Sequence, residues 1–253
     1  MSDTIRTSER IVAGRNQDAE AQLSQIARDA PIPNAELCQN LGLFMPPRSL
    51  KRLMFLNHLY CEALPVHGII IQFGVRWGRD LAIFDSLRTI YEPFNISRKI
   101  VGFDTFQGFP SIDEKDGADP MLVVGGLTTA PDYYSQICGI MSIRQQLDPL
   151  PELKRFEIRQ GEGSEQLKQY LDEHPETIVA LGYFDFDLYE PTKACLELLK
   201  PYLTKGSVLA FDELNFVKSP GETIALREVY PLDSIRIRRS PQFSGQPSYF
   251  VVE

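Results

Sequence analysis

The strongest constraint on the fold is a regular alternation of short apolar runs with helical segments. In chain order the runs are GIIIQF (68–73), KIVGF (99–103), the segment 156–158, TIVALGYFDF (177–186) and SVLAF (207–211). Continuous apolar strands joined through helices predict right-handed crossovers and a parallel sheet with helices on both faces. Segments 234–239 and 248–252 are predicted as two closing antiparallel strands, which makes seven strands in all.

Two regions lie outside this pattern. Residues 17–28 and 49–64 have helical periodicity, with Ser49 expected as an N-cap, so we expect a helical extension over 1–65 and the main domain over 66–253. Residues 105–154 are rich in glycine and proline and are longer than a connector requires, apart from a helix expected near 133–147. This insertion and segment 45–49 are predicted lids, and a merely decorative insertion is the alternative.

Composition and charge exclude several classes of protein. The net charge of −8 argues against a sequence-independent nucleic-acid binder, which needs a basic surface. The four cysteines, Cys38, Cys61, Cys138 and Cys195, lack metal-site spacing and are expected to be reduced thiols. The chain shows neither a signal-peptide pattern nor an apolar run long enough to span a membrane. A cytoplasmic protein without nucleic-acid or membrane partners is therefore expected.

Ligands of open α/β sheets bind beyond the carboxyl ends of the strands, so residues at those ends are candidates for a site. The first run leads into Gln72, Phe73 and a turn with Gly74 and Gly78, where the backbone can approach a ligand closely. Two glycines alone do not make a dinucleotide-binding fingerprint. An ordinary tight turn is the alternative interpretation.

The ends of the second and third runs offer further ligand contacts. Asp104 can accept hydrogen bonds from the two hydroxyls of a ribose, and its alternative role is to cap the following turn. The third run leads to Gly161, Glu162 and Ser164, where backbone or small side chains could meet an adenine ring.

Carboxylates follow the fourth and fifth runs. Asp185, Asp212 and Glu213 would converge if these strands are neighbours, and converging carboxylates repel one another unless a cation or proton is shared. Oxygen ligands without nearby His or Cys suit Mg²⁺ or Ca²⁺. The alternative is that each acid caps its following helix. For Asp187, capping and function are equally favoured.

Several of these segments resemble one known family. The run FDFDLYEPTKACLELLKPYLTKGSVLAFDE resembles the metal-binding core of the macrocin O-methyltransferase family, and FGVRWG, GFDTFQGFP and SPGETIALREV resemble its glycine turn, ribose-binding segment and the segment after its metal acids. The similarity covers about residues 45–252 and is nearest to the branch that methylates nucleotide-activated rhamnose in enediyne biosynthesis. The family often has an acid where Gln72 stands and a second Asp where Glu213 stands.

The resemblance implies a class I, Rossmann-like methyltransferase that uses S-adenosylmethionine and Mg²⁺ to methylate a sugar hydroxyl, such as that of TDP-rhamnose, in natural-product biosynthesis. It also implies a homo-oligomer. Asp185 would be a metal ligand and the base, because His67 and His174 are expected at the wrong end of the sheet; His58 remains an alternative base. Asp212 and Glu213 would complete the metal site. The implied cofactor-binding residues are Gln72, Phe73, Gly74, Asp104, Thr105, Gly161, Glu162 and Ser164.

Two neighbouring residues and two alternative functions stay open from the sequence. Trp77 is expected in packing or lid contact, and Arg76 faces either the methionine carboxylate or solvent. A metal-dependent hydrolase would leave the glycine turn unused and lacks a second set of metal ligands. A non-catalytic nucleotide-binding module would leave three converging acids uncompensated.

Overall fold

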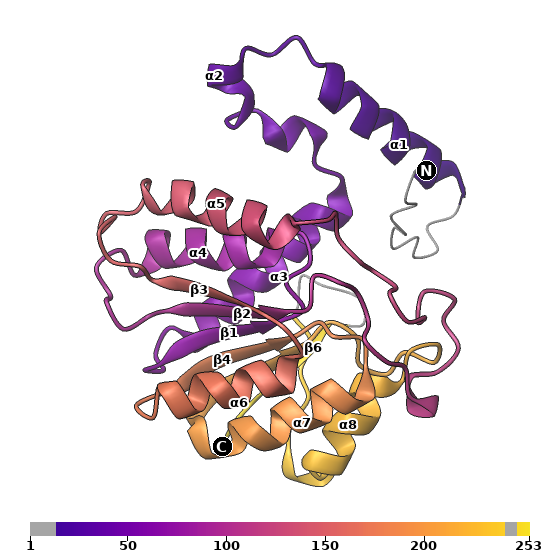
Figure 1. The fold of residues 1–253 in the computed structure, drawn as a ribbon, viewed down its shortest axis with the longest axis vertical. Coiled ribbons are helices and arrows are strands. Elements are labelled where there is room, and N and C mark those ends of the chain that lie inside the picture. The colour runs from indigo at the N-terminus through magenta and orange to yellow at the C-terminus, as the bar shows by residue number, and fades with distance from the viewer. Residues whose placement is uncertain (1–13, 241–246) are drawn as a thin grey trace.

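The computed structural model describes residues 14–240 and 247–253 and contains one six-stranded sheet (Figure 1). Its strands are β1 (Ile69–Phe73), β2 (Ile100–Asp104), β3 (Phe156–Gln160), β4 (Val179–Phe184), β5 (Leu203–Phe211) and β6 (Ser248–Val251). They lie in the order β3-β2-β1-β4-β5-β6, and only the β5–β6 pair is antiparallel. The predicted mostly parallel α/β sheet is therefore confirmed.

The prediction of a seventh strand is wrong for the described residues. Of the segment 234–239, Arg238 forms an isolated antiparallel bridge with Tyr249 of β6, and Ser234 ends a 3₁₀ turn. Both bridge hydrogen bonds are present, at 2.7 and 2.9 Å. Arginines occupy three of the six positions in this segment, so burying it against the sheet gains little free energy. Its pairing with β6 is therefore limited to the single bridge at Arg238.

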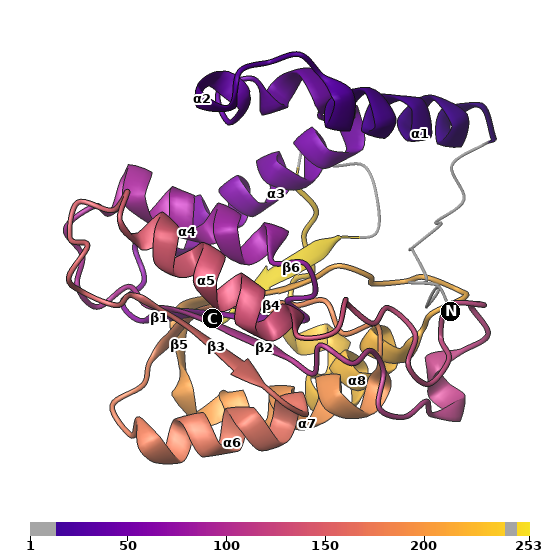
Figure 2. The same ribbon diagram turned by 45° about the horizontal axis from the view of Figure 1, so that its top comes forward.

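Helices cover both faces of the sheet, as Figure 2 shows. One face carries α3 (Pro47–Ala63), α4 (Arg79–Tyr91) and α5 (Tyr133–Gln145). The other carries α6 (Gly163–Glu173), α7 (Tyr189–Leu199) and α8 (Gly221–Val229). Each helix turns a buried apolar stripe to the sheet, which explains why β1 and β4, enclosed on both faces, read as continuous apolar runs.

The register aligns the carboxyl ends of four strands. Phe73 pairs with Phe103 on one side and with Phe184 on the other, and Phe184 pairs with Phe211. The four phenylalanine rings form a row on the face of the sheet that α6, α7 and α8 cover, with neighbouring centroids 4.7 to 5.4 Å apart. The residue after each phenylalanine therefore emerges at the same edge, above a rigid aromatic layer.

Two N-terminal helices, α1 (Gly14–Asp29) and α2 (Asn34–Leu37), extend away from the sheet (Figures 1 and 2). The helix α3 differs from them, because Phe55, Leu56 and Leu59 are fully buried in the core. Its N-cap is Pro46, with Pro47 in the first helical position, so the expected Ser49 cap is wrong. A domain boundary near residue 65 stays a prediction.

The insertion after β2 combines irregular chain with two regular elements. It contains the 3₁₀ turn η2 (Glu114–Asp116) and α5, which ends close to where the sequence predicts. The backbone N–H groups of Ala118 and Asp119 both donate to the carbonyl of Lys218, which ties the insertion to the loop after β5. The remaining 3₁₀ turns are η1 (Leu41–Phe44), η3 (Lys200–Tyr202) and η4 (Leu232–Ser234). No helix among the described residues combines the length and apolar character needed to cross a bilayer.

Candidate active site

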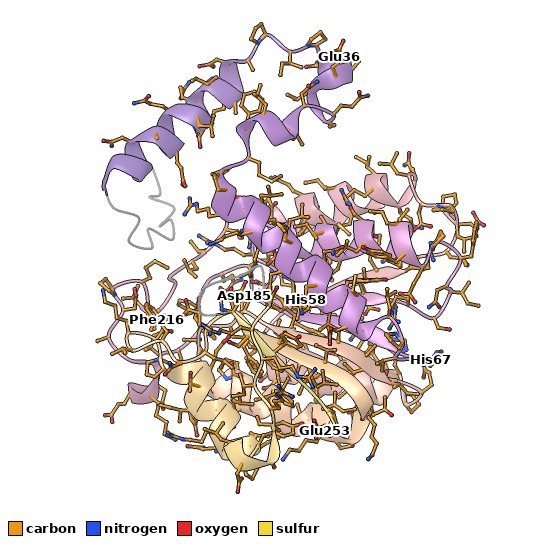
Figure 3. All side chains as sticks on the ribbon, turned by 180° about the vertical axis from the view of Figure 1, so that it is seen from behind. Glu36, His58, His67, Asp185, Phe216 and Glu253 are labelled. Carbon is orange, nitrogen blue, oxygen red and sulfur yellow. The ribbon has the colours of Figure 1, made fainter. Side chains whose placement is uncertain are left out.

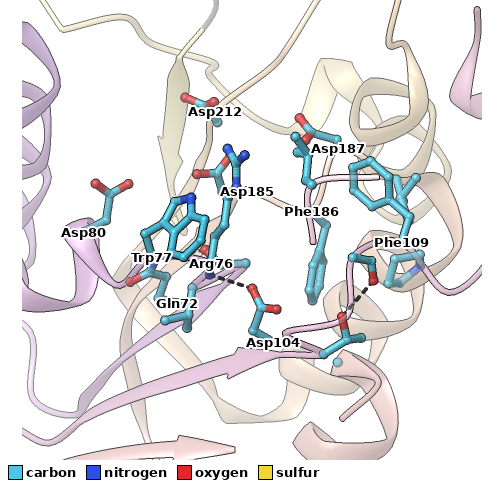
Figure 4. Close-up of a pocket in the computed structure, with 18 of the residues that line it drawn as sticks. Gln72, Arg76, Trp77, Asp80, Asp104, Phe109, Asp185, Phe186, Asp187 and Asp212 are labelled. Atoms are coloured by element: carbon cyan, nitrogen blue, oxygen red, sulfur yellow. Dashed lines mark hydrogen bonds between the residues drawn. The ribbon is translucent and has the colours of Figure 1, made fainter. Parts of the chain in front are cut away.

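A cavity of about 650 Å³ opens at the carboxyl ends of the parallel strands (Figure 4). Of the predicted site residues, the following line it: Gln72, Gly74, Asp104, Thr105, Gly161, Glu162, Asp185 and Asp212. Three others, Phe73, Ser164 and Glu213, do not. The volume lies in the range typical of small-molecule sites, and the insertion borders the opening through residues between 105 and 127.

The turn after β1 requires glycine at its first position. Gly74 has a φ of 82°, and a Cβ atom there would lie 2.1 Å from the carbonyl oxygen of Asp185. Gly78, at φ 80°, forms the left-handed N-cap of α4. The ordinary tight turn is thus present, but Gly74 also lets the ends of β1 and β4 approach each other at the cavity wall.

Gln72 has a buried side chain at the floor of the cavity. Its Nε2 donates to the carbonyl of Gly74 at 2.9 Å, whereas its Oε1 has no hydrogen-bond partner among the described residues. A buried acceptor of this kind is costly unless a ligand supplies the donor. Phe73 is fully buried in the aromatic layer, so its side chain supports the floor and does not contact the cavity.

Asp104 connects the loops after β1 and β2. Its carboxylate accepts the backbone N–H of Arg76 at 2.7 Å and that of Phe106 at 2.6 Å. Burial raises the pKa of this carboxyl above its ordinary value, although the backbone donors partly offset that effect. The turn-capping role is therefore present, and contact with a ribose stays a prediction. Thr105 donates through Oγ1 to the carbonyl of Gly108 at 2.7 Å, which shapes the start of the insertion.

The loop after β3 is organised by Glu162, the N-cap of α6. Its Oε2 accepts the backbone N–H of Glu165 at 2.9 Å and the hydroxyl of Ser164 at 2.6 Å. Ser164 therefore serves the helix cap and does not face the cavity. Gly163 is required there because a Cβ would lie 2.3 Å from the ring of Phe186, an aromatic residue of the cavity wall that sequence reasoning missed.

Asp185 and Asp212 meet at the same edge, as predicted. Their backbone N–H groups continue the sheet ladder, to the carbonyls of Phe73 and Phe184 at 3.0 and 2.9 Å. The helix-cap alternative fails for both, because α7 has Leu188 as its N-cap and α8 has Pro220. The acids are therefore available to the cavity.

The guanidinium of Arg52 joins these two acids, and sequence reasoning missed it. It donates to Asp185 at 2.6 Å, to Asp212, and twice to Asp80 at 2.8 and 3.0 Å. Burial alone would lower the pKa of Arg52, but the surrounding charges, Asp80 foremost, raise it. The available signal was its place on the stripe of α3 that also holds Phe55, Leu56 and Leu59.

Glu213 is buried and lies outside the cavity lining. Asp212 and Glu213 follow directly after β5, which ends at Phe211, and of the two only Asp212 lines the cavity. Among the side chains that the structure describes, no three acidic, histidine or cysteine groups form a cluster suited to a metal ion. The predicted set of three acids is therefore not assembled, while Asp185 and Asp212 remain a facing pair.

Glu222 holds the loops after β4 and β5 in place. Its carboxylate accepts the backbone N–H groups of Phe186, Asp187 and Glu213 at 3.1 to 3.3 Å. Burial, and then the charges of Asp187 and Asp185, raise the pKa of Glu222 well above its ordinary value. The sequence offered only the resemblance of the SPGETIALREV segment as a signal for this residue.

Three residues left open by the sequence now have positions. Asp187 lines the cavity and does not cap α7, whose first N–H is bound by Asp116 at 2.6 Å. Trp77 lines the cavity and packs edge-on against Tyr133, whose hydroxyl donates to the Trp77 carbonyl at 3.0 Å. Arg76 faces the cavity rather than bulk solvent, beside Asp104 and Asp185 (Figure 4).

None of the three histidines lines the cavity. His58 bonds to the hydroxyl of Tyr249 at 2.9 Å, and His174 lies 3.2 Å from Glu176. His67 lies at the far end of the sheet from Asp185, as Figure 3 shows. A histidine base is therefore not positioned at this site.

A sheet of this order, with an antiparallel edge strand and with a glycine turn and an acid at the ends of β1 and β2, defines a Rossmann-like, class I methyltransferase fold. No protein-family model matches the chain, and no curated protein does. Among solved structures, CalS11, the calicheamicin methyltransferase, is 40% identical over 96% of this chain and 94% of its own, with a TM-score of 0.92. The chain therefore belongs to the S-adenosylmethionine-dependent O-methyltransferase family that includes CalS11, as the sequence resemblance predicts.

Two further structures are similar to the chain. An apo structure of CalS11, described as a TDP-rhamnose 3′-O-methyltransferase, is 37% identical over 96% of both chains, with a TM-score of 0.84. The O-methyltransferase NovP is 19% identical over 80% of both chains, with a TM-score of 0.60. The similarity to NovP shows the fold alone.

Proposed function

We propose that this protein transfers the methyl group of S-adenosylmethionine to a hydroxyl of a nucleotide-activated deoxysugar such as TDP-rhamnose, in natural-product biosynthesis. The observation that carries the proposal is a single cavity in which the glycine turn and Asp104 lie beside the strand-end acids Asp185 and Asp212. A cofactor and a second substrate can therefore meet there. The activity of CalS11 on TDP-rhamnose supports the choice of substrate.

The residues on the β1–β3 side suit the cofactor. Gly74 places bare backbone in the cavity wall, and the buried Oε1 of Gln72 can accept an N–H from the ammonium group of the methionine moiety. Asp104 keeps lone pairs for ribose hydroxyls after accepting hydrogen bonds from backbone donors. Phe186 offers an aromatic face near the loop after β3. The bound cofactor would supply an electrophilic methyl group.

The cavity also suits an anionic sugar substrate. Its lining includes the arginines Arg48, Arg52, Arg76 and Arg79. The exposed side chains of Arg48 and Arg79 can contact phosphate oxygens of a nucleotide sugar at the opening. We assign Asp185 as the proton acceptor for the sugar hydroxyl, because no histidine lines the cavity and Asp185 does.

A Mg²⁺ ion is part of the proposal, with Asp185 and Asp212 as its protein ligands. The donor set fits in chemistry, since both are carboxylates, and in charge, since a guanidinium already stands between them. Such an ion would supply Lewis acidity and favour ionisation of a sugar hydroxyl. A contribution from Glu213 would need its side chain to leave its buried position.

Calorimetry with S-adenosylhomocysteine in the presence of Mg²⁺ tests the proposal. We expect one molecule to bind per chain. If S-adenosylhomocysteine does not bind to the folded protein, methyl transfer is ruled out and a metal-dependent hydrolase is favoured. A homo-oligomeric state and a cytoplasmic location belong to the same proposal.

A further inference from the structure

The guanidinium group of Arg52 occupies the space between the two strand-end carboxylates. Its Nη2 donates to Oδ2 of Asp185 at 2.6 Å, and its Nη1 donates to Oδ1 of Asp212. A positive charge at this point removes the repulsion that two neighbouring carboxylates would otherwise experience. A divalent cation would meet the same requirement, so the guanidinium and a metal ion would compete for the same pair of oxygen ligands.

A third carboxylate, that of Asp80, anchors Arg52 from the side. Nε and Nη2 of Arg52 donate to Oδ2 of Asp80 at 3.0 and 2.8 Å. Asp80 has a second cationic partner, because Nε of Arg79 donates to its Oδ1 at 2.5 Å. Arg52 can therefore give up Asp185 and Asp212 while Asp80 still holds it, and no buried charge is then left without compensation.

Arg52 is largely buried, and the packing of α3 holds it in place. Only 7% of the residue is exposed, and its guanidinium carbon lies 5.1 Å from the ring centroid of Tyr183. The helix α3 that carries it is packed into the core through Phe55 and Leu59. Like charges repel more strongly beside a guanidinium that is largely withdrawn from water than they do in bulk solvent. Arg52 and a divalent cation held between the same two carboxylates would therefore repel each other.

We propose that Arg52 is the resident counter-cation of Asp185 and Asp212, and that a divalent cation binds these carboxylates only by displacing the guanidinium from them. This inference rests on the proposed function, which assigns these acids to the ion. Arg52 lowers the apparent affinity for metal and holds the two acids together when no metal is bound. The displaced side chain keeps Asp80 as its partner.

Binding of Mn²⁺ to the full-length protein, followed by the electron paramagnetic resonance signal of the free ion, tests this proposal without substrate or turnover. Arg52→Met removes the charge and keeps much of the side-chain length. We expect it to bind Mn²⁺ at least about tenfold more tightly than the wild type, because one neighbouring charge commonly changes a carboxylate equilibrium by that much. Arg227→Met, exposed on α8, removes the same charge elsewhere and should leave the affinity unchanged.

Arg52→Lys keeps the test decisive if the methionine variant folds poorly. A lysine retains the positive charge, but its single ammonium group cannot span Asp80, Asp185 and Asp212 as the planar guanidinium does. We expect its Mn²⁺ affinity to lie between those of the wild type and Arg52→Met.

Thermal unfolding separates competition with metal from a purely structural role. Arg52→Met should melt at a lower temperature without metal, because it leaves buried carboxylates without their shared partner. Saturating Mn²⁺ should raise its Tm more than that of the wild type, since a ligand that binds the folded state more tightly stabilises it more. A structural role alone would lower Tm without tightening metal binding.

The proposal is overturned if the lysine and methionine variants bind Mn²⁺ no more tightly than the wild type, or if none of the three binds it. The proposed methyl transfer is judged separately by binding of S-adenosylhomocysteine. Tight cofactor binding together with unchanged Mn²⁺ affinities would reject the role of Arg52 and leave the transferase standing. Tighter Mn²⁺ binding without cofactor binding would support the role of Arg52 and reject the transferase.

Discussion

Asp185 and Asp212 accept hydrogen bonds from one and the same guanidinium group, although they stand on different strands. Strands β4 and β5 are parallel neighbours in register, with Phe184 paired to Phe211, so the next residue of each strand emerges at the same place. This pair lines the cavity as two neighbouring acids.

Removal of the Asp212 charge should separate turnover from cofactor binding. In Asp212→Asn we expect kcat/KM to fall by about 10²-fold or more, the scale of a lost catalytic group. Binding of S-adenosylhomocysteine should stay within about a factor of three, because the cofactor residues lie on β1–β3. Turnover and calorimetry measure the two effects. Asp233→Asn, an exposed acid on η4, is the matched control. Activity retained in Asp212→Asn and insensitive to EDTA would refute the metal role.

A methyl group at Gly74 should lower the stability of the protein and weaken cofactor binding. Gly74→Ala brings its Cβ to 2.1 Å from the Asp185 carbonyl and forces a left-handed backbone on alanine. We expect the free energy of unfolding to fall by about 2 kcal/mol or more, and cofactor binding to weaken by about tenfold or more. Gly139→Ala, in α5 with open space around it, should be neutral or stabilising. Equal stability of the two variants in urea would contradict this account.

Glu222 should make folding stability depend on pH. Its pKa is raised in the folded protein, mainly by burial, so the folded state binds this proton more tightly than the unfolded state. The stabilising contribution is present below the ordinary glutamate pKa and is lost as pH rises toward the higher folded pKa. From about pH 5 to about pH 8 the wild type should therefore lose more unfolding free energy than Glu222→Gln. Parallel pH profiles from urea denaturation would show that the carboxylate does not titrate in this way.

The N-terminal arm should mediate assembly of several copies. Ile26, Leu41 and Leu43 are 58%, 52% and 70% exposed on an arm that extends away from the sheet. Apolar side chains grouped on such an arm commonly mark a protein interface. We expect light scattering to report a homo-oligomer, and Leu41→Asp with Leu43→Asp to shift it toward the monomer. Val217→Asp, 91% exposed elsewhere, is the control, and a monomeric wild type would contradict the prediction.

The sequence predicted the sheet because strands buried on both faces give uninterrupted apolar runs, which few other structures produce. A different pattern failed at 234–239, where arginines that alternate with isoleucines predicted a strand but offer little apolar surface to bury. Strand-end acids such as Asp104, Asp185 and Asp212 were predictable, since parallel strands end at one edge. The burial of Glu213 outside the cavity, just beyond the end of β5, was not predicted.

Contacts between elements that lie far apart in the chain could not be predicted from the sequence. Arg52 is brought to the acids by the docking of α3 against β4 and β5, and periodicity cannot specify which strands a helix covers. Glu222 likewise acts on the backbone of two loops that come before it in the chain. Such roles depend on tertiary packing, which no local pattern encodes.

Methyl transfer to an activated sugar can be measured by incubating the protein with methyl-labelled S-adenosylmethionine, Mg²⁺ and a panel of TDP-sugars. Mass spectrometry would follow the products. We expect label to appear on a TDP-deoxysugar, with TDP-rhamnose the first candidate, and one S-adenosylhomocysteine to form for each methyl group transferred. Folded protein that binds S-adenosylhomocysteine but labels no TDP-sugar in the panel would contradict this expectation.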